Sequence, residues 1–239
     1  TRNTQTVTRN WIQVSDFKFQ LSNNMKPRKK HRQIVFCDFD GTITTEETFV
    51  GMVKTFASAP YAEVKQLIID GQITLGEGVR RMVESIPSKK YPDILDYILS
   101  RRIREGFAEL LDDLSSRDVP FVVISGGLQE TVSARLAEYQ GQIHGIHAAK
   151  VVFKNGFLSV SSAFESDVQL VDKTQVMALY DYEAAVMIGD GITDTDMGMS
   201  ADLVFARDYL AHYLAERNKP FIRWKDFFDV REHLIRCRR

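Results

Sequence analysis

The sequence contains only two cysteines, Cys37 and Cys237, which lie far apart in the chain. This excludes a disulfide scaffold and a zinc site built from cysteines alone, and it is typical of a reducing compartment. No run of about 18 apolar residues is present, so nothing predicts a membrane span. An excess of one charge is also missing, because 31 Lys and Arg residues face 32 Asp and Glu residues and the net charge is -1. We therefore expect no nucleic-acid partner and no membrane partner.

What is present is the composition of an ordinary globular protein. The 239 residues are 44% hydrophobic and 26% charged, which is a usual balance for a soluble domain. The length suits one large domain or a core domain with a smaller companion. We expect a soluble intracellular enzyme.

The charge is unevenly distributed along the chain. Residues 1–33 hold eight basic side chains and one acid, Asp16, so they carry +7 and the remaining residues carry -8. Because residues 1–32 lack apolar periodicity, we expect a basic, flexible leader there. Their Thr-, Asn- and Arg-rich beginning is also compatible with the remnant of a transit peptide. The expected location is cytoplasmic, or the stroma of a plastid or another organelle if the leader is such a remnant.

Short apolar runs that end at polar or glycine residues recur along the rest of the chain, as buried parallel strands do. They cover 33–37, 120–124, 184–188 and 203–206, with a weaker one at 221–224. Helical patterns lie between them, for example at 105–117, 128–139 and 173–181. Strands that alternate with helices predict an α/β fold with a doubly wound parallel sheet.

Two segments interrupt this alternation. Residues 46–104 contain no convincing strand and read as helices at roughly 46–57, 60–69, 75–85 and 90–100, which predicts an inserted all-helical domain. Residues 147–161 alternate around Asn155-Gly156, the signal of a two-residue hairpin turn. The predicted organisation is a leader at 1–32, a core formed by 33–45 and 105–239, and the helical insert at 46–104.

Asp38 and Asp40 directly follow the first strand in the segment DFDGT. Two carboxylates two residues apart can converge on one metal ion or one phosphoryl group, and Gly41 lets the backbone turn tightly. Taken alone, the pair is equally compatible with a solvated turn.

Other strand and helix ends favour the chemical interpretation. Ser125-Gly126-Gly127 follows the second strand, Lys173 begins a helix, and Asp190 and Asp194 lie in the loop GDGITD after a third strand. Open α/β sheets place their ligands at this edge. Carboxylates for a hard cation, donors for phosphoryl oxygens and a nucleophile are what phosphoryl transfer needs.

These motifs, in this order over residues 33–207, resemble the haloacid dehalogenase superfamily of aspartate-nucleophile phosphatases. A helical insert after the first motif resembles the phosphoserine-phosphatase-like branch, which implies that residues 46–104 form an all-helical cap over the active site. Within it, the sequence is most similar to the phosphatases of methionine salvage, which act on 2-hydroxy-3-keto-5-methylthiopentenyl-1-phosphate. The similar segments are DFDGTIT (38–44), KTFA (54–57), EGVRRM (77–82), IREGF (103–107), ISGG (124–127), FARDYL (205–210) and DF (near 226–227).

The resemblance implies catalytic roles for Asp38, Asp40 and Lys173. Asp38 attacks phosphorus and becomes an aspartyl phosphate, and Asp40 acts as the general acid and then the general base. The implied cofactor is Mg²⁺, held by Asp38, by the backbone carbonyl of Asp40 and by Asp190. Lys173 neutralises phosphoryl charge, and Asp194 orients Lys173 or a metal-bound water.

The implied substrate-binding residues are Thr42, Glu47, Ser125, Gly126 and Gly127. Simpler interpretations remain open: Lys173 as a surface lysine, Asp194 as a helix cap, and Glu47 as an acid at a helix start.

Glu47 occupies the position where phosphoserine phosphatases bind the substrate amine with a Glu. Glu77 holds the position of their carboxylate-binding Arg, with Arg80 and Arg81 nearby, so we do not expect phosphoserine to be the substrate. Which of these four side chains contacts the substrate stays open.

The expected function is Mg²⁺-dependent hydrolysis of a small phosphorylated metabolite through an aspartyl phosphate, by a monomer or homodimer. Alternatives are a phosphoserine-phosphatase-like enzyme, another phosphatase or phosphotransferase of the same branch, and a non-catalytic binding protein with this fold.

Overall fold

A seven-stranded sheet forms the centre of the computed structural model, which describes residues 29–236. Residues 1–28 of the predicted leader lie outside the described residues. The strands follow one another in space in the order β4-β3-β2-β1-β5-β6-β7. They are β1 (His31–Cys37), β2 (Phe121–Leu128), β3 (Gly145–Lys154), β4 (Phe157–Ser161), β5 (Tyr182–Gly189), β6 (Leu203–Ala206) and β7 (Ile222–Arg223). Strand β1 therefore begins two residues before the predicted start.

The sheet is parallel except at one edge. The central strand β1 pairs in parallel with β2 and with β5, and β5, β6 and β7 continue the parallel order. Strands β3 and β4 are antiparallel around Asn155-Gly156, whose φ angles of 53° and 81° suit the tight turn. The predicted α/β class and the predicted hairpin are confirmed.

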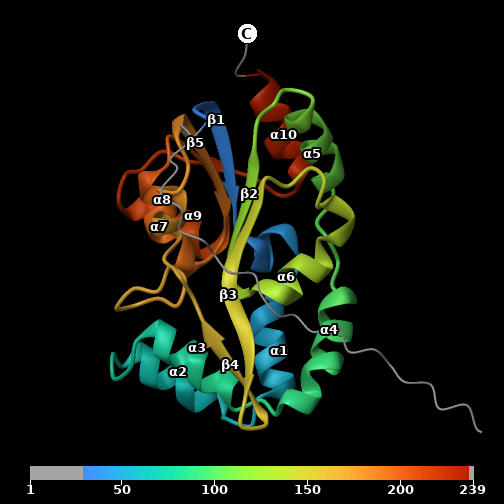
Figure 1. Ribbon diagram of the computed structural model, residues 1–239. Helices are drawn as coiled ribbons and strands as arrows, with labels where there is room; N and C mark the ends of the chain where they lie inside the picture. The colour runs from blue at the N-terminus through green and yellow to red at the C-terminus, as the bar shows by residue number, and fades with distance from the viewer. Residues whose placement is uncertain (1–28, 237–239) are drawn as a thin grey trace, which may run out of the picture.

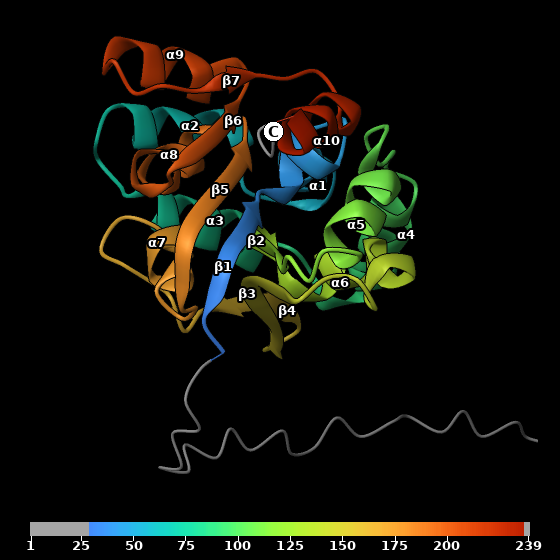
Figure 2. The ribbon, with the colours of Figure 1, turned by 90° about the horizontal axis from the view of Figure 1, so that it is seen from above.

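Both faces of β1 are buried, which explains its nearly continuous apolar run. Ile34 and Phe36 point into one core, and Val35 and Cys37 point into the other. Figure 2 shows helices on both sides of the sheet. The first core includes residues of α7 (Lys173–Met177), α8 (Thr195–Ser200) and α9 (Asp208–Glu216), and the second includes residues of α5 (Phe107–Ser115), α6 (Gln129–Arg135) and α10 (Phe227–Arg236).

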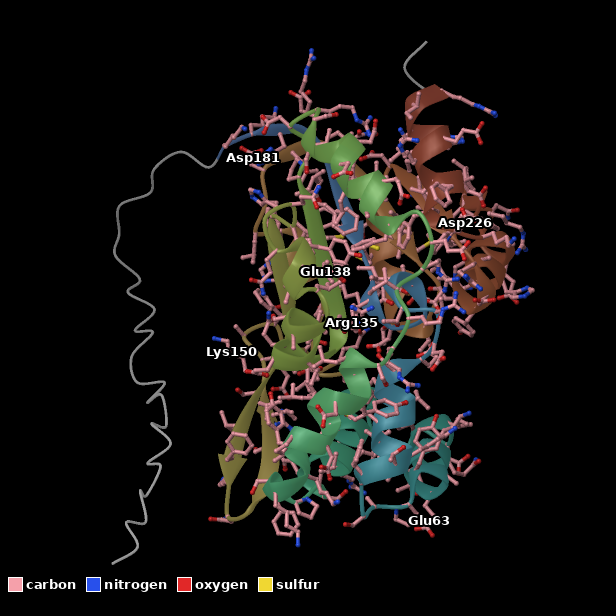
Figure 3. All side chains as sticks on the ribbon, turned by 90° about the vertical axis from the view of Figure 1, so that its right-hand side faces the viewer. Glu63, Arg135, Glu138, Lys150, Asp181 and Asp226 are labelled. Atoms are coloured by element: carbon pink, nitrogen blue, oxygen red, sulfur yellow. The ribbon has the colours of Figure 1, made fainter. Side chains whose placement is uncertain are left out.

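The chain between β1 and β2 is helical, as predicted. It forms α1 (Thr48–Phe56), α2 (Tyr61–Ile69), α3 (Leu75–Glu84) and α4 (Tyr91–Leu99). Figure 1 shows these helices gathered with β4 at one end of the molecule. In Figure 3, Glu63 on α2 and Asp181, which precedes β5, mark opposite ends. None of the helices in residues 29–236 is long and apolar enough to cross a membrane.

The two connections to this helical segment run side by side. A β-bridge joins Thr44 to Ile103, Thr45 N donates to Arg102 O (3.0 Å), and Arg104 N donates to Ile43 O (2.8 Å). The chain that leads into the helical segment and the chain that leads out of it are therefore paired next to the loop that follows β1.

Two helices end four residues before their predicted ends. The helix predicted at 128–139 ends at Arg135 and is followed by a 3₁₀ turn at Ala137–Tyr139, and the helix predicted at 173–181 ends at Met177. Tyr180 leaves the second helix and packs its ring edge-on against Phe36, with centroids 5.8 Å apart. Local periodicity does not reveal such a long-range contact.

Candidate active site

The loop after β1 carries the first two acids. Asp38 is buried at the end of the strand, and the chain then turns tightly over Phe39–Ile43. Gly41 has a φ of 77°, and a Cβ at this position would collide with the carboxylate of Asp190. Glycine therefore permits both the turn and the close approach of the second acidic loop.

Lys173 lies between two of the acids. Its Nζ donates to Asp38 Oδ1 (2.5 Å) and to Asp194 Oδ1 (2.7 Å). The residue is only 2% exposed, which contradicts the alternative of a surface lysine. Asp172 caps α7 by accepting from Thr174 N (3.0 Å), so that the helix begins at Lys173. Burial alone would lower the pKa of Lys173, but Asp194 and Asp38 raise it above its usual value.

Asp194 has both carboxylate oxygens engaged. Oδ1 accepts from Lys173, and Oδ2 accepts from the backbone amides of Asp190 (3.0 Å) and Gly191 (2.9 Å). Asp194 therefore fixes the lysine and folds its own loop, and it is not merely a cap of α8.

Asp38, Asp190 and Asp194 form an acidic group that fits a metal ion. Each offers a carboxylate oxygen, and these atoms lie within 4.8 Å of one another. Burial, together with the neighbouring Asp194 carboxylate, raises the pKa of Asp38 well above its usual range and that of Asp190 to about 6. A hard divalent cation would relieve this crowding of like charge. Because Asp194 is fully engaged, Asp38 and Asp190 are the better ligands.

Thr42 contacts the acidic group through Asp190. Its buried hydroxyl donates to Asp190 Oδ1 (2.6 Å). The structure thus places Thr42, expected among the substrate-binding residues, against an acid and outside the cavity lining.

Asp40 is held by the start of α1. One carboxylate oxygen accepts from the hydroxyl of Thr48 and from Phe49 N (3.0 Å), and the other accepts from Ser125 Oγ (3.3 Å). Burial raises the pKa of Asp40 to about 6, which suits a group that both donates and accepts a proton. Sequence reasoning missed Thr48, whose one signal was its position at the start of the predicted helix.

The Ser125-Gly126-Gly127 segment lies on the other side of Asp40 from Thr48 and Phe49. Ser125 Oγ accepts from Gly127 N (3.0 Å), and a Cβ on Gly127 would lie 3.2 Å from Asp40 Oδ2. Gly126 faces the cavity. The glycines let this turn lie close to Asp40.

A cavity of about 330 Å³ opens above these groups. Its floor consists of Asp38, Asp40, Gly126, Gly191 and Thr193. Its wall consists of Phe49 and Val50 from α1, Tyr61, Ile68 and Ile69 from α2, and Leu75, Val79 and Met82 from α3. Glu47, Lys65 and Ile192 complete the lining. The helical segment therefore faces the acids with a mainly apolar surface.

Four side chains were considered as possible contacts of the substrate. Glu47 lines the cavity, whereas Glu77, Arg80 and Arg81 do not. Arg80 donates to Glu165 (2.6 Å) and to the carbonyl of Val160, and Arg81 pairs with Glu77 (2.6 Å). Partial burial, followed by the charges of Asp190 and Asp40, raises the pKa of Glu47 to about 7.

Two named relatives cover most of this chain. A 2-hydroxy-3-keto-5-methylthiopentenyl-1-phosphate phosphatase of Microcystis aeruginosa (strain NIES-843 / IAM M-2473) is 45% identical over 206 residues, which are 85% of this chain and 98% of the relative. The phosphatase of the same name from Bacillus cereus (strain AH187) is 31% identical over 210 residues, 84% of this chain and 94% of the relative.

Solved structures share the fold at lower identity. A phospho-aspartyl intermediate analogue of phosphoserine phosphatase superposes with a TM-score of 0.63 at 22% identity, and covers 86% of this chain and 99% of its own. The phosphoserine phosphatase from T. onnurineus has a TM-score of 0.64 at 18% identity, with coverages of 88% and 97%. A family model of haloacid dehalogenase-like hydrolases matches residues 35–199. The chain belongs to the haloacid dehalogenase-like hydrolases.

Proposed function

We propose that this chain is a Mg²⁺-dependent phosphatase that hydrolyses 2-hydroxy-3-keto-5-methylthiopentenyl-1-phosphate. One observation carries the proposal: a single cavity joins Asp38 and Asp40 to an apolar wall provided by the helical segment. The acids suit a phosphate ester, and the wall suits an apolar end on the same molecule. The names of the two relatives support this choice of substrate.

Asp38 is the proposed nucleophile. One of its carboxylate oxygens bonds to phosphorus as the bond from phosphorus to the ester oxygen breaks, which leaves an aspartyl phosphate. Its Oδ1 is fixed by Lys173, so Oδ2 is the oxygen free to attack. Lys173 also offers a positive charge beside the transferring phosphoryl group.

Asp40 is the proposed general acid and general base. It gives one to the departing ester oxygen, which leaves as the alcohol, and then accepts one from the water that attacks the aspartyl phosphate. Inorganic phosphate leaves and both carboxyl groups return to their first state. The contacts from Thr48, Phe49 and Ser125 hold Asp40 in place for both steps.

Asp38, Asp190 and the backbone carbonyl of Asp40 would hold the magnesium ion. When bound, the ion supplies positive charge to the phosphoryl oxygens. The crowded carboxylates and their raised pKa values support this site.

The cavity argues against an amino-acid phosphate. Among the described residues that line it, Lys65 is the one cation, and Arg80 and Arg81 are paired elsewhere. A substrate carboxylate would therefore lack the bidentate partner that arginine provides. We include in the proposal that residues 46–104 act as a cap over the core.

The test compares esters on the purified protein. We expect phosphate release from the methylthiopentenyl ester with a kcat/KM far above that for phosphoserine, full loss of activity with EDTA, and recovery when Mg²⁺ is added. The Asp38→Asn variant serves as the inactive control. A preference for phosphoserine would overturn the substrate, and activity that survives EDTA would overturn the magnesium site.

A further inference from the structure

Two segments of the resemblance remain without a role, at 103–107 and 205–210. They contribute Arg104 and Arg207 to one cluster, which also contains Trp224 and the backbone of Lys225. None of these residues lines the cavity. They lie instead against the two loops that carry the acids.

Arg104 contacts four successive carbonyl groups of the loop after β1. Its Nη2 donates to Gly41 O (2.5 Å) and Thr44 O (3.3 Å), and its Nε donates to Thr42 O (2.8 Å). Its backbone N donates to Ile43 O (2.8 Å). One residue thus fixes residues 41–44, which lie between the two acids of the loop and α1.

The geometry requires an arginine. A guanidinium presents five N–H groups in a rigid plane and can donate to several carbonyls at once, whereas an ammonium is a flexible point charge. Burial, followed by the charge of Arg207, lowers the pKa of Arg104. The backbone carbonyls compensate for this burial because each one accepts a hydrogen bond.

Trp224 holds the guanidinium plane from the other side. Arg104 lies 5.2 Å and Arg207 lies 5.6 Å from the centroid of its ring. Trp224 is 6% exposed, and within residues 29–236 its indole N–H has no hydrogen-bond partner. The ring therefore acts through its face, by cation–π contact and packing.

Arg207 connects the cluster to the second acidic loop. Its backbone N donates to Gly189 O (3.3 Å), and Leu210 N donates to Asp190 O (2.9 Å). Arg104, Trp224 and Arg207 thus form one stack that touches the loop of Asp38 and Asp40 on one side and the loop of Asp190 on the other.

We propose that Arg104 is a positioning residue for phosphoryl transfer: its guanidinium, stacked on Trp224, holds the carbonyls of residues 41–44 and so fixes Asp38 and Asp40 relative to Asp190. Thr42, whose carbonyl bonds to Arg104 and whose hydroxyl bonds to Asp190, is the direct link. The inference rests on the proposed phosphatase function.

Kinetics of Arg104→Lys and Arg104→Ala test it first. A displacement of about 1 Å in a catalytic group can lower a rate about 10²-fold, so we expect a fall in kcat of that order with little change in KM. Millimolar guanidinium should restore part of the activity of Arg104→Ala, and methylammonium should not. Arg102→Lys is the matched control, because its side chain is 74% exposed two residues away and should leave kcat unchanged.

Hydrogen exchange gives a readout that does not depend on turnover. In Arg104→Lys the amides of residues 41–45 should exchange faster, while those of β5 and α5 stay as in the wild type. Exchange that rises throughout the chain would assign Arg104 a merely structural role and overturn the inference. Wild-type kcat in Arg104→Lys, or no rescue of a folded Arg104→Ala, would also overturn it.

The two proposals fail in distinguishable ways. If the wild-type protein releases no phosphate from any ester, the proposed function is wrong. If Asp38→Asn is inactive and Arg104→Lys is as active as the wild type, the function stands and the positioning role is wrong.

Discussion

The floor and the wall of the cavity are built in opposite ways. The acids at and beside the floor are bound by a lysine of α7, by hydroxyl groups from the loop after β1, from α1 and from β2, and by backbone amides of α1 and of the 190–194 loop. The wall is formed by apolar side chains from three consecutive helices of one segment. In the proposed function this difference separates the reaction from the choice of substrate: bond breaking would depend on the floor, and the fit of the remaining molecule would depend on the wall.

The two regions also respond differently to substitution. Removal of one partner from a buried ion pair leaves an uncompensated charge and lowers the free energy of unfolding by about 3–5 kcal/mol. Loss of a few methylene groups from a substrate pocket changes selectivity by about 1–3 kcal/mol. Floor variants should therefore affect every ester alike, and wall variants should affect only esters with an apolar end.

The largest effect is expected for Asp38→Asn. The amide keeps the shape of the carboxylate but is a poor nucleophile, so kcat should fall by about 10⁴-fold or more for both the methylthiopentenyl ester and methyl phosphate. Phosphate release measures this, with thermal unfolding as the check that the variant is folded. Equal activity of variant and wild type on either ester would contradict it.

Thr48→Val tests how the floor depends on Asp40. The change keeps the side-chain shape and removes the hydroxyl that donates to Asp40. A hydrogen bond to a charged group contributes about 1.5–3 kcal/mol, so kcat should fall roughly 10- to 100-fold for both esters. The control is Thr55→Val on the same helix, whose hydroxyl is exposed and bonds to the carbonyl of Gly51 (2.8 Å). An effect confined to the methylthiopentenyl ester would assign Thr48 to the wall.

Ile68→Ala tests the wall. The truncation enlarges the apolar part of the cavity, and kcat/KM for the methylthiopentenyl ester should fall about tenfold, while that for methyl phosphate stays unchanged. Leu99→Ala on α4 is the matched control, because Leu99 is 51% exposed and does not line the cavity. If both esters lose activity equally, the wall does not select the substrate.

Glu47→Gln gives the smallest expected effect, on stability rather than turnover. The pKa of Glu47 is raised from 4.5 to about 7 in the folded, metal-free protein. The folded state then binds more protons than the unfolded state between these values, so this residue lowers stability as pH rises through that range. Unfolding midpoints in EDTA should show Glu47→Gln gaining on the wild type across this pH range. Parallel pH curves would show that the carboxyl is not shifted.

The acids and their neighbours at the carboxyl edge of the sheet were largely predictable from the sequence. Asp38, Asp40, Ser125 and Asp190 each follow an apolar run, and parallel strands bring such ends to one edge. Lys173 was recognised by its motif, but its burial between two acids was not predictable. The positions of the motifs in the sequence do not show which atoms contact one another at the carboxyl edge of the sheet.

The wall and the support behind the floor were not predictable in the same way. Helix positions within 46–104 followed from periodicity and proline spacing, but the face that Ile68 and Val79 present depends on how the helices pack. Arg80 is a residue type that could bind a substrate carboxylate, but it pairs with Glu165 instead. Arg104 lies in a segment of the resemblance, but its role was not predictable, because its partners are backbone carbonyls and any sequence has those.

The stack on Trp224 has a consequence for the order of protein synthesis. Arg104 bonds to the carbonyl of Lys225, 121 residues further along the chain. On the ribosome, the acids at 38, 40, 190 and 194 and the lysine at 173 are all made before Trp224 emerges. A nascent chain that already contains these five charged groups therefore still lacks the ring that holds the Arg104 guanidinium, and full activity should begin only after that last strand and helix have been translated and folded into place.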